Sequence, residues 1–160
     1  MQVIKAPSIE AIKNDITVFL AGSIEMGSAE DWQTRIVEDF KAVDVTFFNP
    51  RRDAWDSSWE QKQSNEEFNF QVNWELNRLD YCDIMFMYFS PETKSPISLL
   101  ELGLIAGRNP EKVVVCCPDG FWRKGNVDIT CTRLGVPVYN NLSDAIGALE
   151  TKISQRAWQI

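Results

Sequence analysis

The stretch IMFMYFSPETKSPISLLELGLIA, residues 84–106, decides the predicted fold class. Residues 84–89 are all apolar or aromatic, which is typical of a buried strand. Residues 96–106 begin with a proline, which the first turn of a helix permits, and continue with mostly apolar side chains. A strand that leads directly into a helix predicts an α/β protein.

The same alternation of strand-like and helix-like segments continues on both sides of this stretch. Residues 1–14 are expected to be irregular or partly helical, and the polar, Trp-rich residues 50–63 are expected to form a loop. Ser28 is the expected N-cap of the first helix. We expect strands at 16–21, 45–48, 84–89, 113–117 and 136–139, and helices at 28–42, 68–79, 96–106, 128–134 and 142–156.

Strands that alternate with helices predict a parallel sheet with helices on both faces. We therefore expect a flavodoxin- or Rossmann-like three-layer sandwich with five parallel strands in the order 2-1-3-4-5. A chain of 160 residues fits a single domain over residues 1–160. In this strand order, the loops after the first and third strands meet where such sheets usually bind ligands.

The composition argues against several classes of function. The formal net charge is −7 and no basic stripe is present, which argues against binding to nucleic-acid backbones. No apolar run is long enough to span a bilayer, and residues 1–8 lack the apolar core of a signal peptide. We therefore expect a cytoplasmic protein with neither nucleic-acid nor membrane partners.

The chain contains four Cys and no His. The cysteines are expected to be reduced thiols rather than zinc ligands, and we expect no metal and no cofactor. Without His, the chain has no Ser-His or Cys-His nucleophile pair. General acid–base chemistry must therefore fall to carboxylates, Tyr or Lys.

Glu101 is the first candidate catalytic residue, because it is the only acid in the run Ser-Pro-Ile-Ser-Leu-Leu-Glu-Leu-Gly at 95–103. A carboxylate among apolar residues at the mouth of a strand-to-helix turn must be neutralised, paired or used. The alternative is an ordinary acid near a helix N-terminus that favours the helix dipole. Gly22, Ser23 and Ile24 follow the first strand and are expected to line the same crevice.

Several motifs along the chain together resemble a known family. They are Phe-Leu-Ala-Gly-Ser-Ile at 19–24, Asp-Trp-Gln at 31–33, Asn-Pro-Arg-Arg at 49–52, Trp-Glu-Leu at 74–76, the run at 95–103 and Trp-Arg-Lys-Gly-Asn-Val at 122–127. From about the first strand to the fifth, the chain resembles the nucleoside 2-deoxyribosyltransferase-like family and its relatives, the 2′-deoxynucleoside 5′-phosphate N-glycosidases.

The resemblance implies that Glu101 is the nucleophile. It also implies that Glu75 is a second catalytic carboxylate, although relatives usually carry Asp at the matching position. The alternative for Glu75 is a solvated acid on the helix face beside Arg78.

Ser95 matches a serine that contacts the 5′-phosphate in the nucleotide-hydrolysing relatives. The nucleoside transferases instead carry an Asp there, which binds the 5′-hydroxyl of the sugar. Glu25 stands where those hydrolases have Arg, and a carboxylate at that position would repel phosphate. Candidates to compensate for this charge are Arg51, Arg52 and the pair Arg123-Lys124.

The loop at 50–63 and the segment 122–127 supply the remaining candidates. We expect substrate contacts from Asn49, Arg51, Asp53 and Trp55, with Trp55 offering a stacking surface for a base. The alternative for Trp55 is that it covers the core or builds a subunit contact. The resemblance implies that Asn126 reaches the site of a neighbouring subunit, in a homodimer or larger homo-oligomer. The alternative for Asn126 is a helix N-cap.

These observations predict an enzyme that breaks the N-glycosidic bond of a small-molecule nucleoside or nucleotide. The sugar would pass either to a second base or to water. Two other functions stay open. One is a module that binds a nucleotide-like ligand without turnover, and the other is a structural protein that shares only the fold.

Overall fold

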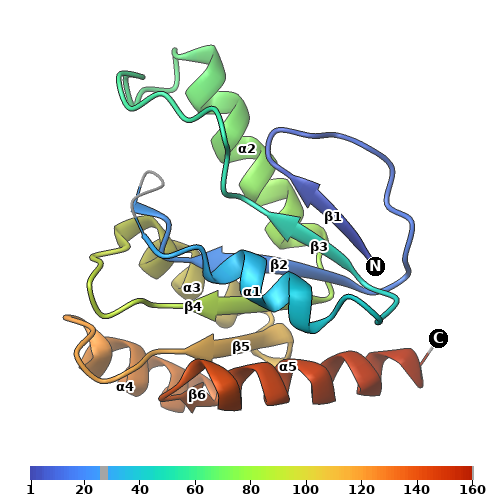
Figure 1. Cartoon of the computed structure of the whole chain (residues 1–160). Coiled ribbons are helices and arrows are strands. Elements are labelled where there is room, and N and C mark those ends of the chain that lie inside the picture. Colours follow the sequence, from blue (N-terminus) through green and yellow to red (C-terminus); the bar gives the residue numbers. More distant parts are fainter. Residues whose placement is uncertain (26–28, 160) are drawn as a thin grey trace.

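Parallel strands form one open sheet at the centre of the protein (Figure 1). The computed structural model describes residues 1–25 and 29–159, and over these residues the sheet has six strands in the order β1-β3-β2-β4-β5-β6. The strands are β1 (Gln2–Lys5), β2 (Thr17–Gly22), β3 (Thr46–Asn49), β4 (Ile84–Tyr88), β5 (Val113–Cys116) and β6 (Val138–Tyr139). This architecture confirms the predicted three-layer α/β fold.

The predicted number of strands was wrong, because β1 forms where an irregular or partly helical segment was expected. Residues Gln2–Lys5 pair in parallel with β3 and extend the sheet by one edge strand. A run of four residues is too short to show the alternation of apolar and polar side chains that marks a strand. Its assignment depends on pairing with the open edge of β3, which the sequence does not show. The other five strands follow the predicted order 2-1-3-4-5.

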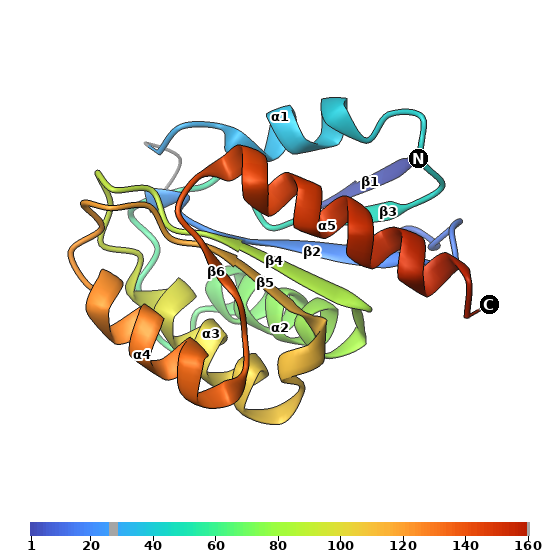
Figure 2. The same cartoon turned by 90° about the horizontal axis from the view of Figure 1, so that it is seen from below.

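Helices cover both faces of the sheet (Figure 2). One face carries α1 (Trp32–Asp39) and α5 (Leu142–Ala157), and the other carries α2 (Glu66–Tyr81), α3 (Pro96–Arg108) and α4 (Lys124–Leu134). Alternate residues of each central strand point to opposite faces, so Phe19 belongs to the α2–α4 core whereas Leu20 belongs to the α1–α5 core.

The helix boundaries refine the predicted ones. Asp31 is the N-cap of α1 and accepts a hydrogen bond from the backbone N–H of Thr34, whereas the predicted cap, Ser28, lies outside the described residues. α4 begins at Lys124 rather than at residue 128, so Asn126 lies within the helix and is not its N-cap. This boundary was missed because a short, polar first turn has no apolar period to mark it.

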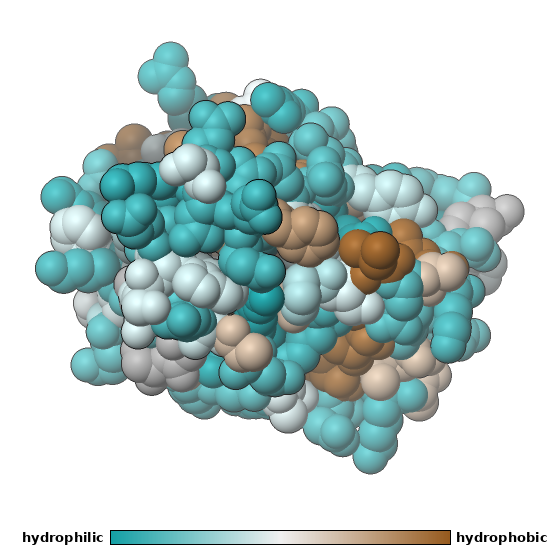
Figure 3. All heavy atoms as spheres, turned by 90° about the horizontal axis from the view of Figure 1, so that it is seen from above, coloured by the Kyte–Doolittle hydropathy of each residue, from teal (hydrophilic) through white to brown (hydrophobic). Residues whose placement is uncertain are grey.

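Among the described residues, no helix is both long enough and apolar enough to cross a bilayer. Seen from above, the surface is mostly hydrophilic, and hydrophobic side chains appear in a few small patches (Figure 3). The four cysteines are free thiols and all are buried.

Candidate active site

The carboxyl ends of β2 and β4 lie directly against each other, as the predicted strand order requires. β2 ends at Gly22, and the N–H of the next residue, Ser23, donates to the carbonyl of Tyr88 at the end of β4, 2.9 Å away. Gly22 has a φ of 135°, and a Cβ there would lie 2.1 Å from the Tyr88 carbonyl oxygen. Glycine is therefore required for this close approach.

The two predicted ligand loops meet through a buried cluster of hydroxyl groups. Ser23 Oγ lies 2.7 Å from both Thr93 Oγ1 and Ser95 Oγ, and the latter two oxygens are 2.9 Å apart. The Thr93 hydroxyl is also placed to donate to the carbonyl of Ser90. Because each hydroxyl supplies one hydrogen, at most three of these four contacts are hydrogen bonds at one time, and the three groups can satisfy one another without a ligand. The cluster thus fixes the start of α3 against the end of β2.

Glu25 crosses from the first loop to the start of α3. Its Oε1 accepts hydrogen bonds from the backbone N–H groups of Lys94, at 2.9 Å, and of Ser95, at 2.8 Å. Both Glu25 and Ser95 have positive φ angles, 47° and 45°, which side-chain-bearing residues adopt rarely. A carboxylate of the protein itself therefore occupies the N-terminal end of α3.

Glu101 lies on the buried face of α3, which also carries Ser98, Leu102 and Ile105. The spacing of these positions keeps them on one side of the helix, and Glu101 is only 8% exposed. Loss of water raises the pKa of Glu101 to about 8, with a further contribution from the negative charge of Glu75.

Glu75 is partly buried on α2, the neighbouring helix of the same layer. Burial raises its pKa to about 7, and the hydrogen bond from Gln71 opposes that rise. A negative charge on Glu75 disfavours ionisation of Glu101. The structure thus brings the two predicted carboxylates together, and Glu75 is not a solvated surface acid.

Gln71 joins this pair and was not singled out from the sequence. It is buried on α2, and its Nε2 donates to Glu75 Oε1, at 2.8 Å, and to the carbonyl of Pro50, at 3.2 Å. Its Oε1 is buried with no hydrogen-bond partner among the described residues. The four-residue spacing from Glu75 was the sequence signal for this contact. An unpartnered acceptor beside two acids favours a ligand with a donor group.

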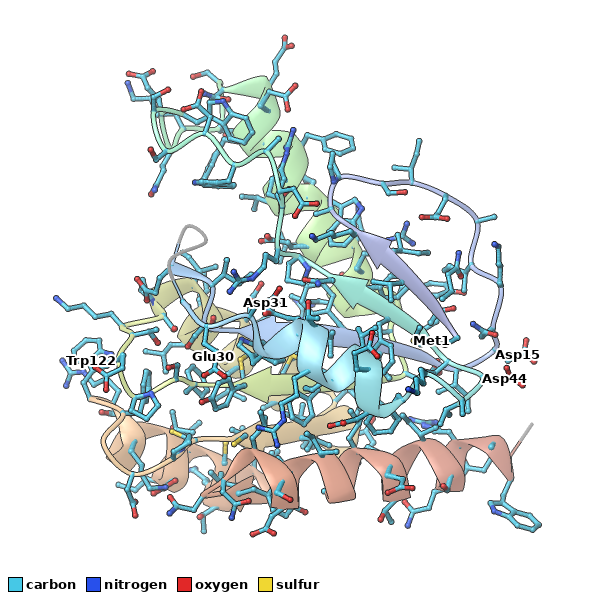
Figure 4. All side chains as sticks on the ribbon, in the orientation of Figure 1. Met1, Asp15, Glu30, Asp31, Asp44 and Trp122 are labelled. Atoms are coloured by element: carbon cyan, nitrogen blue, oxygen red, sulfur yellow. The ribbon has the colours of Figure 1, made fainter. Side chains whose placement is uncertain are left out.

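The residues at the end of β3 mostly organise the loops. Asn49 is buried, and its side-chain oxygen accepts the N–H of Arg51 at 2.9 Å. The Arg51 guanidinium donates to the carbonyls of Ala29, at 2.7 Å, and Glu30, at 2.9 Å. Arg51 therefore ties this loop to the segment before α1, where Figure 4 labels Glu30 and Asp31. Asp53 pairs with Lys5 of β1.

The Trp-rich loop stands away from the sheet beside the first turns of α2 (Figure 1). Trp55 packs edge-on against Trp59, with ring centroids 5.2 Å apart, and the Arg52 guanidinium lies 4.7 Å from the Trp59 ring. Neither Trp belongs to the two core clusters. The core-covering alternative therefore loses support, and a base-stacking surface and a subunit contact stay open.

Asn126 is the third residue of α4. It is exposed on α4 and lines a hollow between α3 and α4. The hollow is also lined by Leu99, Leu102, Gly103, Arg123, Val127 and Thr130. No group of three or more His, Cys, Asp or Glu residues suited to a metal ion occurs in residues 1–25 and 29–159.

A comparison with models of known protein families identifies the family of this chain. The family model described as "Nucleoside 2-deoxyribosyltransferase like" matches residues 15–121. The chain belongs to this nucleoside 2-deoxyribosyltransferase-like family. Membership indicates deoxyribosyltransferase-like activity on a small nucleoside ligand. The matched range includes Gly22, Glu75 and Glu101 but stops before Asn126, so it is shorter than the resemblance predicted from the sequence.

Other comparisons add support for the fold alone. No curated protein matches the chain significantly. A solved structure, the "conserved protein from Enterococcus faecalis V583", is similar with a TM-score of 0.59 and 15% sequence identity. The similarity covers 88% of this chain and 98% of that protein, so it extends over nearly the whole fold.

Proposed function

We propose that this protein cleaves the N-glycosidic bond of a nucleoside or nucleotide, with Glu101 as nucleophile and Glu75 as the acid that serves the leaving base. The sugar then passes to a second base or to water. The observation that carries this proposal is a pair of carboxyl groups with raised pKa values on adjacent helices, Glu101 buried and Glu75 partly buried, in a chain of this family.

The chemistry requires two carboxyl groups in different protonation states. A Glu101 oxygen bonds to the anomeric carbon as the bond from that carbon to the base nitrogen breaks, and the base leaves with a proton from Glu75. In the second step, water or an acceptor base attacks the same carbon and Glu101 leaves as a carboxylate. Glu75 takes the proton that the attacking group releases.

Both acids have raised pKa values, about 7 for Glu75 and about 8 for Glu101, so the pair holds a proton near neutral pH. Attack on a substrate requires that proton on Glu75 and a negative charge on Glu101. The unpartnered Oε1 of Gln71 supplies a contact for a donor group of that substrate.

We expect a bell-shaped dependence of kcat/KM on pH, centred between about 7 and 8. Below the pKa of Glu75, about 7, both groups are protonated and no nucleophile is present; above that of Glu101, about 8, both are ionised and the acid is lost. Free base released from 2′-deoxynucleosides is measured by chromatography across this range. A rate unchanged from about pH 5 to 9 would contradict the shared-proton model.

The same chromatographic measurement tests the function itself. Release of free base from at least one nucleoside or 5′-nucleotide supports cleavage, and appearance of a new nucleoside when a second base is added identifies transfer. Binding of these compounds without release of any base would contradict the proposal and favour a module that only binds its ligand.

We propose that a second copy of the chain covers the α3–α4 face. Leu100 of α3 and Ile129 of α4 are 68% and 73% exposed, and Trp122, which precedes α4 and is labelled in Figure 4, is half exposed. Apolar side chains of this size favour a subunit interface. Sedimentation equilibrium is expected to show a dimer or larger, and Leu100→Asp is expected to weaken it. A monomer at micromolar concentrations would contradict this assembly and the role of Asn126 in a neighbouring site.

A further inference from the structure

The start of α3 bears on which sugars the proposed site accepts. Ser95 precedes Glu101 by six residues, and a helix rises about 1.5 Å per residue, so the two positions lie about 9 Å apart along the axis. A pentose with its anomeric carbon at Glu101 therefore brings its 5′ end toward the start of α3 when it lies along the helix.

A helix N-terminus normally offers free backbone N–H groups and a partial positive charge to a phosphate. In this protein the N–H groups of Lys94 and of the N-cap residue Ser95, just before the first turn of α3, are already bound to Glu25 Oε1. Pro96, the first residue of α3, has no N–H at all. The hydroxyl groups of Ser23, Thr93 and Ser95 have partners in one another and in the Ser90 carbonyl.

A phosphate at this place would have to displace a carboxylate or lie against it. Like charges in contact repel each other, and the positive charge of Lys94 in this segment is exposed, where screening weakens its attraction for a phosphate. A neutral 5′-hydroxyl is not repelled, because it carries no charge and can donate a hydrogen bond to a carboxylate.

We propose that Glu25 is a specificity-determining residue that closes the start of α3 to phosphate, so that the site takes nucleosides with a free 5′-hydroxyl. This inference rests on the proposed function, because it assumes a sugar held at Glu101. The carboxylate of Glu25, rather than a phosphate, is the anion at the start of α3.

The experiment compares base release from 2′-deoxynucleosides with release from their 5′-monophosphates. The unmodified protein is expected to prefer the nucleosides in kcat/KM by on the order of a hundredfold. In Glu25→Gln, the amide oxygen can keep both backbone hydrogen bonds while the charge is lost, so this preference is expected to fall by about tenfold or more. Glu92→Gln removes an exposed charge from the same loop and is expected to leave the preference unchanged.

A preference of the unmodified protein for monophosphates, or an unchanged preference in Glu25→Gln, would overturn the role of Glu25. In either case the release of base would still support the proposed function. If no compound is cleaved, calorimetry measures whether the protein binds nucleosides more tightly than their monophosphates. Selective nucleoside binding that Glu25→Gln relaxes supports the role of Glu25 although cleavage fails. Absence of binding by every compound overturns both proposals.

Discussion

Glu101→Gln is expected to lower the rate of base release by about three orders of magnitude or more. The same variant is expected to be more stable than the unmodified protein. The amide cannot form a glycosyl ester, and removal of a catalytic nucleophile typically has an effect of this size or larger. Because glutamine has nearly the same shape as glutamate, the buried face of α3 should pack as before. Free base after single and multiple turnovers is the measurement.

The gain in stability follows from the sign of the pKa shift. The pKa of Glu101 rises from 4.5 in the unfolded chain to about 8 in the folded protein, so the folded state holds more protons between these values. Stability therefore falls as pH rises from about 4.5 to about 8, and at pH 7 the loss is about 3 kcal/mol. Glu101→Gln removes this contribution, so its advantage in urea unfolding should be large at pH 8 and small at pH 5.

Two results would contradict this assignment. One is base release by Glu101→Gln at a rate near that of the unmodified protein, and the other is a variant less stable at pH 8. Glu92→Gln, which changes an exposed acid, is the control for a general effect of charge. A covalent adduct on Glu101 after treatment with a 2-fluoro-sugar substrate, seen by mass spectrometry, would be the direct positive result.

Gly22→Ala is expected to destabilise the protein by on the order of 3–5 kcal/mol and to abolish activity with it. A Cβ at residue 22 would lie 2.1 Å from the Tyr88 carbonyl oxygen, a backbone atom that cannot move without separating β2 from β4. The φ of 135° adds strain for any residue with a side chain. The midpoint of urea unfolding is the measurement.

Gly147→Ala is the matched control for this substitution. Gly147 lies within α5, and a Cβ there would meet nothing within 4 Å. Alanine in a helix interior is favoured over glycine by about 0.5–1 kcal/mol, so this variant should be slightly more stable. An unfolding midpoint of Gly22→Ala equal to that of the unmodified protein would show that the strand ends tolerate the added atom.

The central sheet was predictable because its strands are continuous apolar runs separated by helical patterns. The pairing of Glu75 with Glu101 was predicted only through the resemblance to the family, since no local pattern links residues on two helices. The loss of water at Glu101 was expected, because it is the lone acid in an apolar run.

Other features required the three-dimensional contacts. The hydrogen bonds of Glu25 join residues about 70 positions apart, so the sequence indicated its charge but not its partners. Arg51 was expected to contact substrate, yet two backbone carbonyls before α1 accept its hydrogen bonds. Edge strand β1 has too few residues for a period, and its formation depends on the free edge of β3.

The two acids lie on helix faces that help to form the hydrophobic core beside the sheet, where Trp74 and Leu102 are their chain neighbours. Core packing therefore sets how much water reaches them, and so how acidic they are. Evolution can shift the working pH of such a protein by enlarging or shrinking apolar side chains that never touch a substrate. Adaptation to a different pH would then appear as substitutions in the interior of the protein, while the residues that contact the substrate stay the same.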